Sequence, residues 1–144
     1  MPFIFLPLAM ALTLACLCGC SDSRNSGNSG NPGNPEKKID QGQAWEIVKK
    51  NILNDNPGNS IVYRSKDLLN ADQEVKSWQQ TYTVPKDFKK AWLFFVDDQP
   101  DANWGHKCRY IFVDAESGKY QVINSLTPPD SMDDMTKIFP PPET

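Results

Sequence analysis

Hydrophobic and polar residues recur with a helical period near residue 40 of the chain. Asp40 can act as an N-cap, and Gln43 follows three residues later, as in a capping box. Five apolar residues then recur at helical spacing, with charged residues on the other side; they are Ala44, Trp45, Val48, Ile52 and Leu53. The sequence of residues 54–58, Asn-Asp-Asn-Pro-Gly, interrupts this pattern. The spacing predicts one amphipathic helix that begins after Asp40 and ends before residue 54.

The second half of the chain shows the shorter patterns typical of β-strands. Residues 91–96 form a continuous apolar and aromatic run, as expected of a buried strand. Residues 108–114 alternate between two faces and form a second predicted strand. Residues 115–118 have the composition of a hairpin turn, with Gly118 where a positive φ is needed, and residues 120–123 return as a third strand.

Other segments give weaker signals. Residues 61–63 and 81–84 are expected to be extended. Residues 65–80 fit either a helical turn or an irregular crossing. Residues 129–144 are rich in Pro and Asp, and we expect a poorly structured tail in which Ile138 and Phe139 dock.

The order of these elements predicts an α+β fold, in which one N-terminal helix packs on an antiparallel β-sheet meander. This order resembles PepSY and cystatin-like domains. The most specific match is segment 112–122, Phe-Val-Asp-Ala-Glu-Ser-Gly-Lys-Tyr-Gln-Val, because PepSY-type domains commonly carry Asp-Ala-x-(Thr/Ser)-Gly between two strands. The resemblance implies a protein that modulates an extracytoplasmic peptidase or another envelope partner through sheet or loop contacts.

The first nineteen residues contain no charged side chain and have the pattern of a secretory signal peptide. Their apolar run is shorter than the roughly 20 residues that a transmembrane helix needs. The run ends in Leu-Cys-Gly-Cys at residues 17–20, which resembles the lipobox of bacterial lipoproteins. That resemblance implies cleavage before Cys20 and attachment of lipid, including palmitate, to this cysteine.

The other two leader cysteines fit the lipobox less well. Cys16 has Thr13 where the lipobox has Leu, and Cys18 has Leu17 where a small residue belongs. The leader also lacks the Lys or Arg that such signal peptides usually carry near the start. Cleavage by the ordinary route and an uncleaved signal anchor therefore remain alternatives to lipidation.

Residues 20–38 are rich in Ser, Asn, Gly and Pro and cannot bury apolar area, so we expect a flexible tether. A tether of this length spans on the order of 20 Å root mean square. The predicted organisation is a signal peptide at 1–19, the lipidated cysteine and tether at 20–38, one domain at 39–128 and the tail at 129–144. Ser21, in place of a retention Asp, implies by the lipoprotein resemblance an outer-membrane or cell-surface location in the envelope.

Charge and cysteine content exclude several classes of function. The net charge is −3, which gives no basic footprint for nucleic acid. Of four cysteines only Cys108 falls in the predicted domain, so no disulfide can form within it. We expect neither a metal nor another cofactor.

His106 and Cys108 are the strongest candidates for chemistry. On a strand, positions two apart share a face, so the pair could form a nucleophile with its base or half of a metal site. A zinc site needs about four ligands, and the domain holds no other His or Cys. The alternative is that Cys108 is a small buried hydrophobe and His106 a loop-end side chain.

The polar loop at 97–105 also offers oxygen ligands and one tryptophan. The spacing of Asp101, Asn103 and Gly105 resembles part of a calcium loop, but Phe112 occupies the place of the bidentate acid. The neighbouring carboxylates Asp97 and Asp98 would point to opposite faces of a strand. Trp104 either contacts a partner or folds back on the loop.

These observations favour a non-catalytic binding or inhibitory module displayed at a membrane by a lipid anchor, with an extracytoplasmic protein as its partner. We do not expect an enzyme. The alternative is an enzymatic or small-ligand-binding cone-type domain with a pocket near His106 and Cys108. A wide cavity between helix and sheet that opens beside His106 would favour the pocket, and a filled core with Trp104 exposed would favour the binding module.

Overall fold

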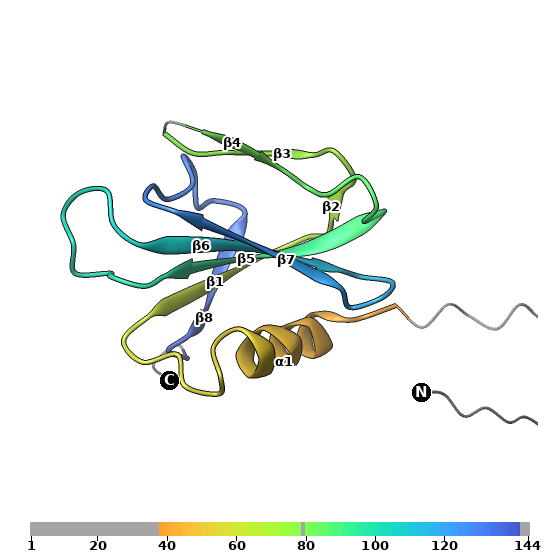
Figure 1. Ribbon diagram of the computed structural model, residues 1–144, viewed down its shortest axis with the longest axis horizontal. Helices are drawn as coiled ribbons and strands as arrows, with labels where there is room; N and C mark the ends of the chain where they lie inside the picture. The colour runs from red at the N-terminus through yellow and green to blue at the C-terminus, as the bar shows by residue number, and fades with distance from the viewer. Residues whose placement is uncertain (1–37, 79, 142–144) are drawn as a thin grey trace, which may run out of the picture. The chain divides into compact units, whose positions relative to one another are not determined.

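The computed structural model describes residues 38–78 and 80–141 (Figure 1). The predicted signal peptide, Cys20 and the tether up to residue 37 lie outside the described residues. The described part contains one helix and eight strands: α1 (Gln41–Asn51), β1 (Ile61–Ser65), β2 (Leu69–Asn70), β3 (Glu74–Lys76), β4 (Thr81–Thr83), β5 (Lys90–Asp97), β6 (Cys108–Asp114), β7 (Tyr120–Ser125) and β8 (Met135–Phe139).

Helix α1 confirms the predicted capping box and helical span. The Asp40 carboxylate accepts a hydrogen bond from the Gln43 amide at 2.8 Å, and the Gln43 side chain accepts one from the Asp40 amide at 3.1 Å. Asn54 and Asp55 then adopt left-handed backbone conformations, which turn the chain away from the helix axis. Among the described residues, no helix is both long and apolar enough to cross a membrane.

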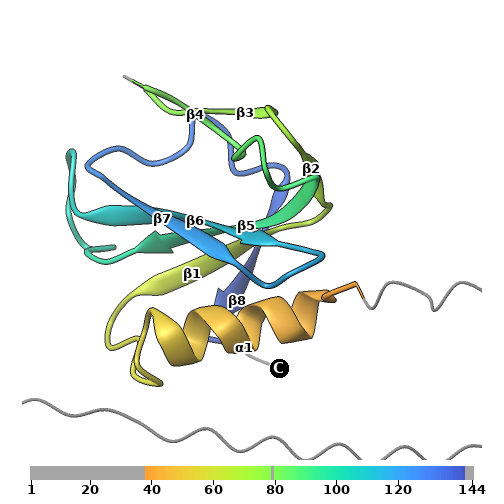
Figure 2. The ribbon, with the colours of Figure 1, turned by 45° about the vertical axis from the view of Figure 1, so that its right-hand side comes forward.

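The main sheet is antiparallel, with the strand order β7-β6-β5-β1-β8 and β2 paired to the start of β5. Its two central strands are buried on both faces, which explains their nearly continuous apolar sequence. On β5, Trp92, Phe94 and Val96 face the core under α1, and Leu93 and Phe95 face the opposite core. Figures 1 and 2 show α1 on one side of this sheet and the β3–β4 hairpin on the other.

The β3–β4 hairpin forms a second sheet that covers the face opposite α1. Tyr82 of β4 packs against Tyr110 of β6, with ring centroids 4.4 Å apart. Val84 and Phe88, from the connection to β5, are buried in the same core. The main sheet is therefore enclosed between a helix and a hairpin.

The predicted α+β fold with a simple meander is wrong. The described part is mostly antiparallel β-structure with one short helix, and β1 lies between β5 and β8, so the sheet does not follow chain order. The prediction missed three strands: β2 and β3, which lie within residues 65–80, and β8 in the predicted tail. Two- and three-residue strands are too short to show an alternating pattern.

The prediction that residues 129–144 form a poorly structured tail is also wrong. Residues 135–139 form β8, which pairs with β1 at the edge of the main sheet. The predicted docking of Ile138 and Phe139 is confirmed, because both pack against the core under α1. The boundary predicted at residue 128 therefore falls inside the folded part. The pairing partner of β8 lies about seventy residues earlier in the chain, so no local pattern reveals it.

Candidate functional site

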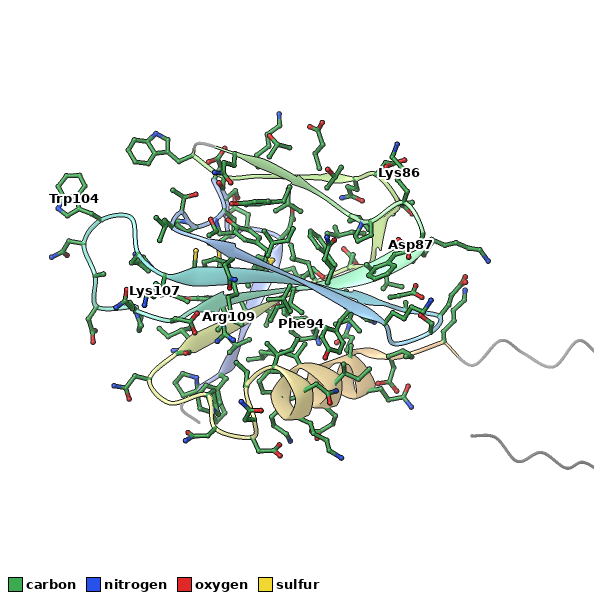
Figure 3. The ribbon with its side chains drawn as sticks, viewed as in Figure 1. Lys86, Asp87, Phe94, Trp104, Lys107 and Arg109 are labelled. Carbon is green, nitrogen blue, oxygen red and sulfur yellow. The ribbon has the colours of Figure 1, made fainter. Side chains whose placement is uncertain are left out.

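The loop between β5 and β6 displays Trp104 at one end of the main sheet (Figure 3). Its base is closed by a hydrogen bond of 3.1 Å from the Asp98 amide to the Lys107 carbonyl. The side chain of Trp104 is nonetheless 83% exposed, so it does not fold back on the loop. Of the two alternatives for this residue, the exposed position is the one observed.

Two further large apolar side chains, Leu126 and Trp78, are also exposed. Leu126, which follows β7, is 63% exposed, and its carbonyl accepts a hydrogen bond of 2.9 Å from the His106 amide. Trp78, at the turn between β3 and β4, is 75% exposed. Its neighbour Ser77 makes a 2.9 Å hydrogen bond with Thr127. We call these three exposed residues, Trp78, Trp104 and Leu126, the tryptophan end.

A groove of about 510 Å³ opens at the tryptophan end. Its lining is mixed polar and apolar: Gln80, Asp98, Lys107, Cys108, Asn124, Ser125, Leu126 and Thr127. The polar floor is well connected, because the Thr127 carbonyl accepts hydrogen bonds from the Tyr110 hydroxyl and the Ser125 hydroxyl. Tyr82 donates to Ser125 at 2.7 Å and so holds the hairpin over the groove. These hydrogen bonds hold the polar side chains at the base of the groove in place.

His106 and Cys108 do not form a catalytic pair. The Nδ1 of His106 donates to the Trp104 carbonyl at 2.6 Å, and its Nε2 lies 3.0 Å from Oδ1 of Asp97. That second contact is close enough for an ion pair when the imidazole is protonated, but its direction is not that of a hydrogen bond. The Sγ of Cys108 instead faces the Thr127 carbonyl, at 3.4 Å. Both nitrogens of the imidazole thus face oxygen atoms and neither engages the thiol.

The environment of Cys108 makes it unreactive. The residue is 1% exposed, and burial is the main cause that raises the pKa of its thiol. Because only the thiolate is nucleophilic, a raised pKa and a buried sulfur both slow alkylation. This is the environment of a small buried hydrophobe.

We expect iodoacetamide to label Cys108 in the native protein at neutral pH at least about 100-fold more slowly than in the protein unfolded in urea. Mass spectrometry of the modified peptide over time gives both rates. Raising the pH to 9 should accelerate labelling in urea much more than in the folded protein, because the folded thiol still holds its proton there. Rapid native labelling at neutral pH would contradict this assignment.

The adjacent acids Asp97 and Asp98 contact different partners. Asp98 accepts hydrogen bonds from the Arg109 guanidinium, at 2.8 Å from Nε, and from the Ser60 hydroxyl at 3.1 Å. Asp97 lies beside His106 and accepts from the Gln99 amide. These contacts fix the start of the loop and leave no pair of carboxylates in a common site. In the described ranges, no group of three or more His, Cys, Asp or Glu side chains could hold a metal ion.

The sequence pointed to Trp104 but missed Trp78 and Leu126. Trp78 lies in the segment whose structure was ambiguous, and Leu126 lies just past the predicted third strand. A tryptophan between polar residues is a usable signal for Trp78, but its proximity to Leu126 depends on tertiary structure. Comparisons with protein-family models, curated proteins and solved structures find no match to this chain.

Proposed function

We propose that this chain is a lipid-anchored protein of the bacterial cell envelope whose domain binds a protein partner through the tryptophan end. The observation that carries the proposal is the exposure of three large apolar side chains, Trp78, Trp104 and Leu126. Of these three, Leu126 lines the groove of about 510 Å³. Tryptophan is enriched among the residues that dominate binding energy at protein interfaces. An exposed cluster of large apolar side chains, rimmed by polar groups, is typical of a binding surface.

The position of the tryptophan end suits an anchored protein. Residue 38, where the predicted tether joins the domain, and the loop that carries Trp104 lie at opposite ends of the described part in Figures 1 and 2. A chain anchored through Cys20 would therefore present Trp104 at the end away from its attachment. A flexible tether leaves this end free to meet a partner.

The packing between helix and sheet favours a binding surface over an internal pocket. Val48 and Phe94 are fully buried there, and the Trp45 ring stacks on Phe94 with centroids 6.2 Å apart. Cys108 lines the groove at the tryptophan end, but His106 does not. A small-ligand or enzymatic domain centred on both residues is thus the weaker candidate. Modulation of a peptidase, which rested on the family resemblance, has no separate support from the site.

The anchor is tested with the full chain expressed in a bacterial host. We expect the wild type to enter the membrane fraction and to incorporate labelled palmitate, and Cys20→Ser to lose both properties. Cys16→Ser is the matched control and should behave as the wild type. Membrane recovery and labelling of Cys20→Ser at wild-type levels would contradict lipidation at this residue.

The binding surface is tested by affinity capture from solubilised envelopes with the full chain. Trp104→Ala combined with Leu126→Ser should reduce recovery of the partner at least about tenfold, since each truncated interface anchor commonly costs 1–2 kcal/mol or more. Lys50→Ala, an exposed change on α1, is the control and should leave recovery unchanged. Recovery that is equal for all three proteins, or a bound small molecule in place of a protein, would contradict the proposed surface.

A further inference from the structure

Strand β7 forms an unprotected edge of the main sheet. No strand of the described part pairs with its outer side. Natural edge strands are usually guarded by Pro, bulges or charges. The opposite edge, β8, pairs through an irregular register and contains Lys137. In contrast, β7 reads Tyr-Gln-Val-Ile-Asn-Ser in regular register with β6, and its Tyr120 and Val122 are exposed.

The register determines which backbone groups of β7 face outward. The Asp114 amide donates to the Lys119 carbonyl at 2.8 Å, so these two residues form a hydrogen-bonded pair. In an antiparallel ladder such pairs alternate with non-bonded ones. The residues that bond to β6 are therefore Gln121, Ile123 and Ser125. The amides and carbonyls of Tyr120, Val122 and Asn124 point away from β6 and are available to another strand.

Two grooves lie along this edge, one at each end of β7. The groove at the tryptophan end includes Asn124 and Ser125. The other, of about 630 Å³, includes Phe88, Tyr120 and Gln121. Gln121 and Ser125 lie four residues apart, which is about 13 Å along a strand. An added strand could therefore place side chains of the same face in both grooves, while its backbone pairs with β7.

The charges along the edge define the chemistry of such a strand. Lys107 lines the groove at the tryptophan end, and Lys119 lines the other. Neither lysine makes an ion pair within the part of the chain that the structure describes. Figure 3 shows Lys107 near Trp104 at one end, and Lys86 with Asp87 at the other. Both ends of β7 thus present positive groups. Asp87 offsets part of the charge at one end, and Asp98, which lines the groove beside Lys107, is already paired with Arg109.

We infer that the partner binds as an extended segment that adds a strand to the outer edge of β7. Its middle would carry alternating apolar residues, which pack on Tyr120 and Val122, and its two ends would carry Asp or Glu beside Lys107 and Lys119. The inference rests on the proposed function, because it names the part of the partner that the domain recognises. Trp104 and Leu126 then extend the contact beyond the end of the added strand.

The test uses Val122→Pro in the full chain, solubilised in mild detergent. Proline removes the outward amide of Val122 but no hydrogen bond to β6, so an edge position of this kind tolerates it. Val122→Thr is the matched control, because it keeps both the amide and the branched shape. The probe is a displayed library of random seven-residue peptides, selected on the wild type.

We expect the wild type and Val122→Thr to enrich peptides with an alternating apolar centre and acidic ends. The best of these peptides should bind Val122→Pro at least about tenfold more weakly than it binds the wild type. A variant of this peptide with Lys in place of its acidic residues should also bind the wild type more weakly. Hydrogen exchange supplies an independent measurement on the wild type. The peptide should slow exchange at Tyr120, Val122 and Asn124 at least about tenfold. The hydrogen-exchange measurement uses the wild type, so it tests the inference even if Val122→Pro fails to fold.

The inference is overturned by enrichment of peptides without this pattern, by equal binding to Val122→Pro, or by protection elsewhere in the domain without protection of Tyr120, Val122 and Asn124. A wild-type dimer that Val122→Pro converts to a monomer would also overturn it, since the edge would then be covered by a second copy. These outcomes differ from failure of the proposed function. If capture of the partner depends on Trp104 and Leu126 but not on Val122, only the added strand is wrong.

Discussion

Replacing Phe94 by Ala should destabilise the domain by about 3–5 kcal/mol, the largest effect we expect from a single substitution. Phe94 lies in the centre of β5, is fully buried and stacks on Trp45 of α1. Its removal leaves a cavity between helix and sheet that neighbouring backbone cannot fill, because β1 and β6 hold β5 on both sides. Urea denaturation followed by tryptophan fluorescence gives the change in the free energy of unfolding.

The matched control is Trp104→Ala, which removes an even larger aromatic side chain from the surface. Because Trp104 is exposed, its loss should change the free energy of unfolding by no more than about 0.5 kcal/mol. The difference between the two changes in the free energy of unfolding distinguishes a residue of the core from a residue of the surface. Similar effects from the two substitutions would mean that the assignment of core and surface is wrong.

A chain that ends at Asp134 should lose about 2–4 kcal/mol of stability. The truncation removes β8, together with the partly buried side chains of Ile138 and Phe139. It also leaves β1 as an unpaired edge, with its backbone groups exposed to water. Thermal and urea unfolding of the truncated and full chains measure the loss.

A chain that ends at Pro141 is the control for this truncation, because it keeps β8 entire. It should unfold at the same urea concentration as the full chain. If the chain ending at Asp134 is equally stable, residues 135–139 contribute nothing to the stability of the fold. The experiment therefore decides between a tail and a structural strand.

The two halves of the proposed function depend on different parts of the chain. In the proposal, anchoring would depend on the sequence around Cys20, which lies outside the described residues, and binding would depend on Trp78, Trp104 and Leu126. Cys20→Ser should abolish membrane recovery without changing partner binding in detergent. The combined change at Trp104 and Leu126 should do the reverse.

Elements whose signals are local could be predicted from the amino-acid sequence. The capping box of Asp40 and Gln43 defined the start of α1, because both partners lie within one turn. Residues 91–96 and 108–114 were long and apolar enough to identify β5 and β6. Gly118 has a φ of 74°, so the hairpin turn after β6 was also readable from the chain.

The way in which distant segments combine could not be predicted from the sequence and follows from the three-dimensional fold. The short strands at 69–70 and 74–76, and β8 at the end of the chain, exist because they pair with partners elsewhere in the sequence. The same holds for the candidate site, where Trp78, Trp104 and Leu126 come from three separate connections. Periodicity reports which face of a segment is buried, but not which segment covers it. The sequence could therefore name Trp104 as a candidate, whereas the groove beside it and the open edge of β7 follow from strand order alone.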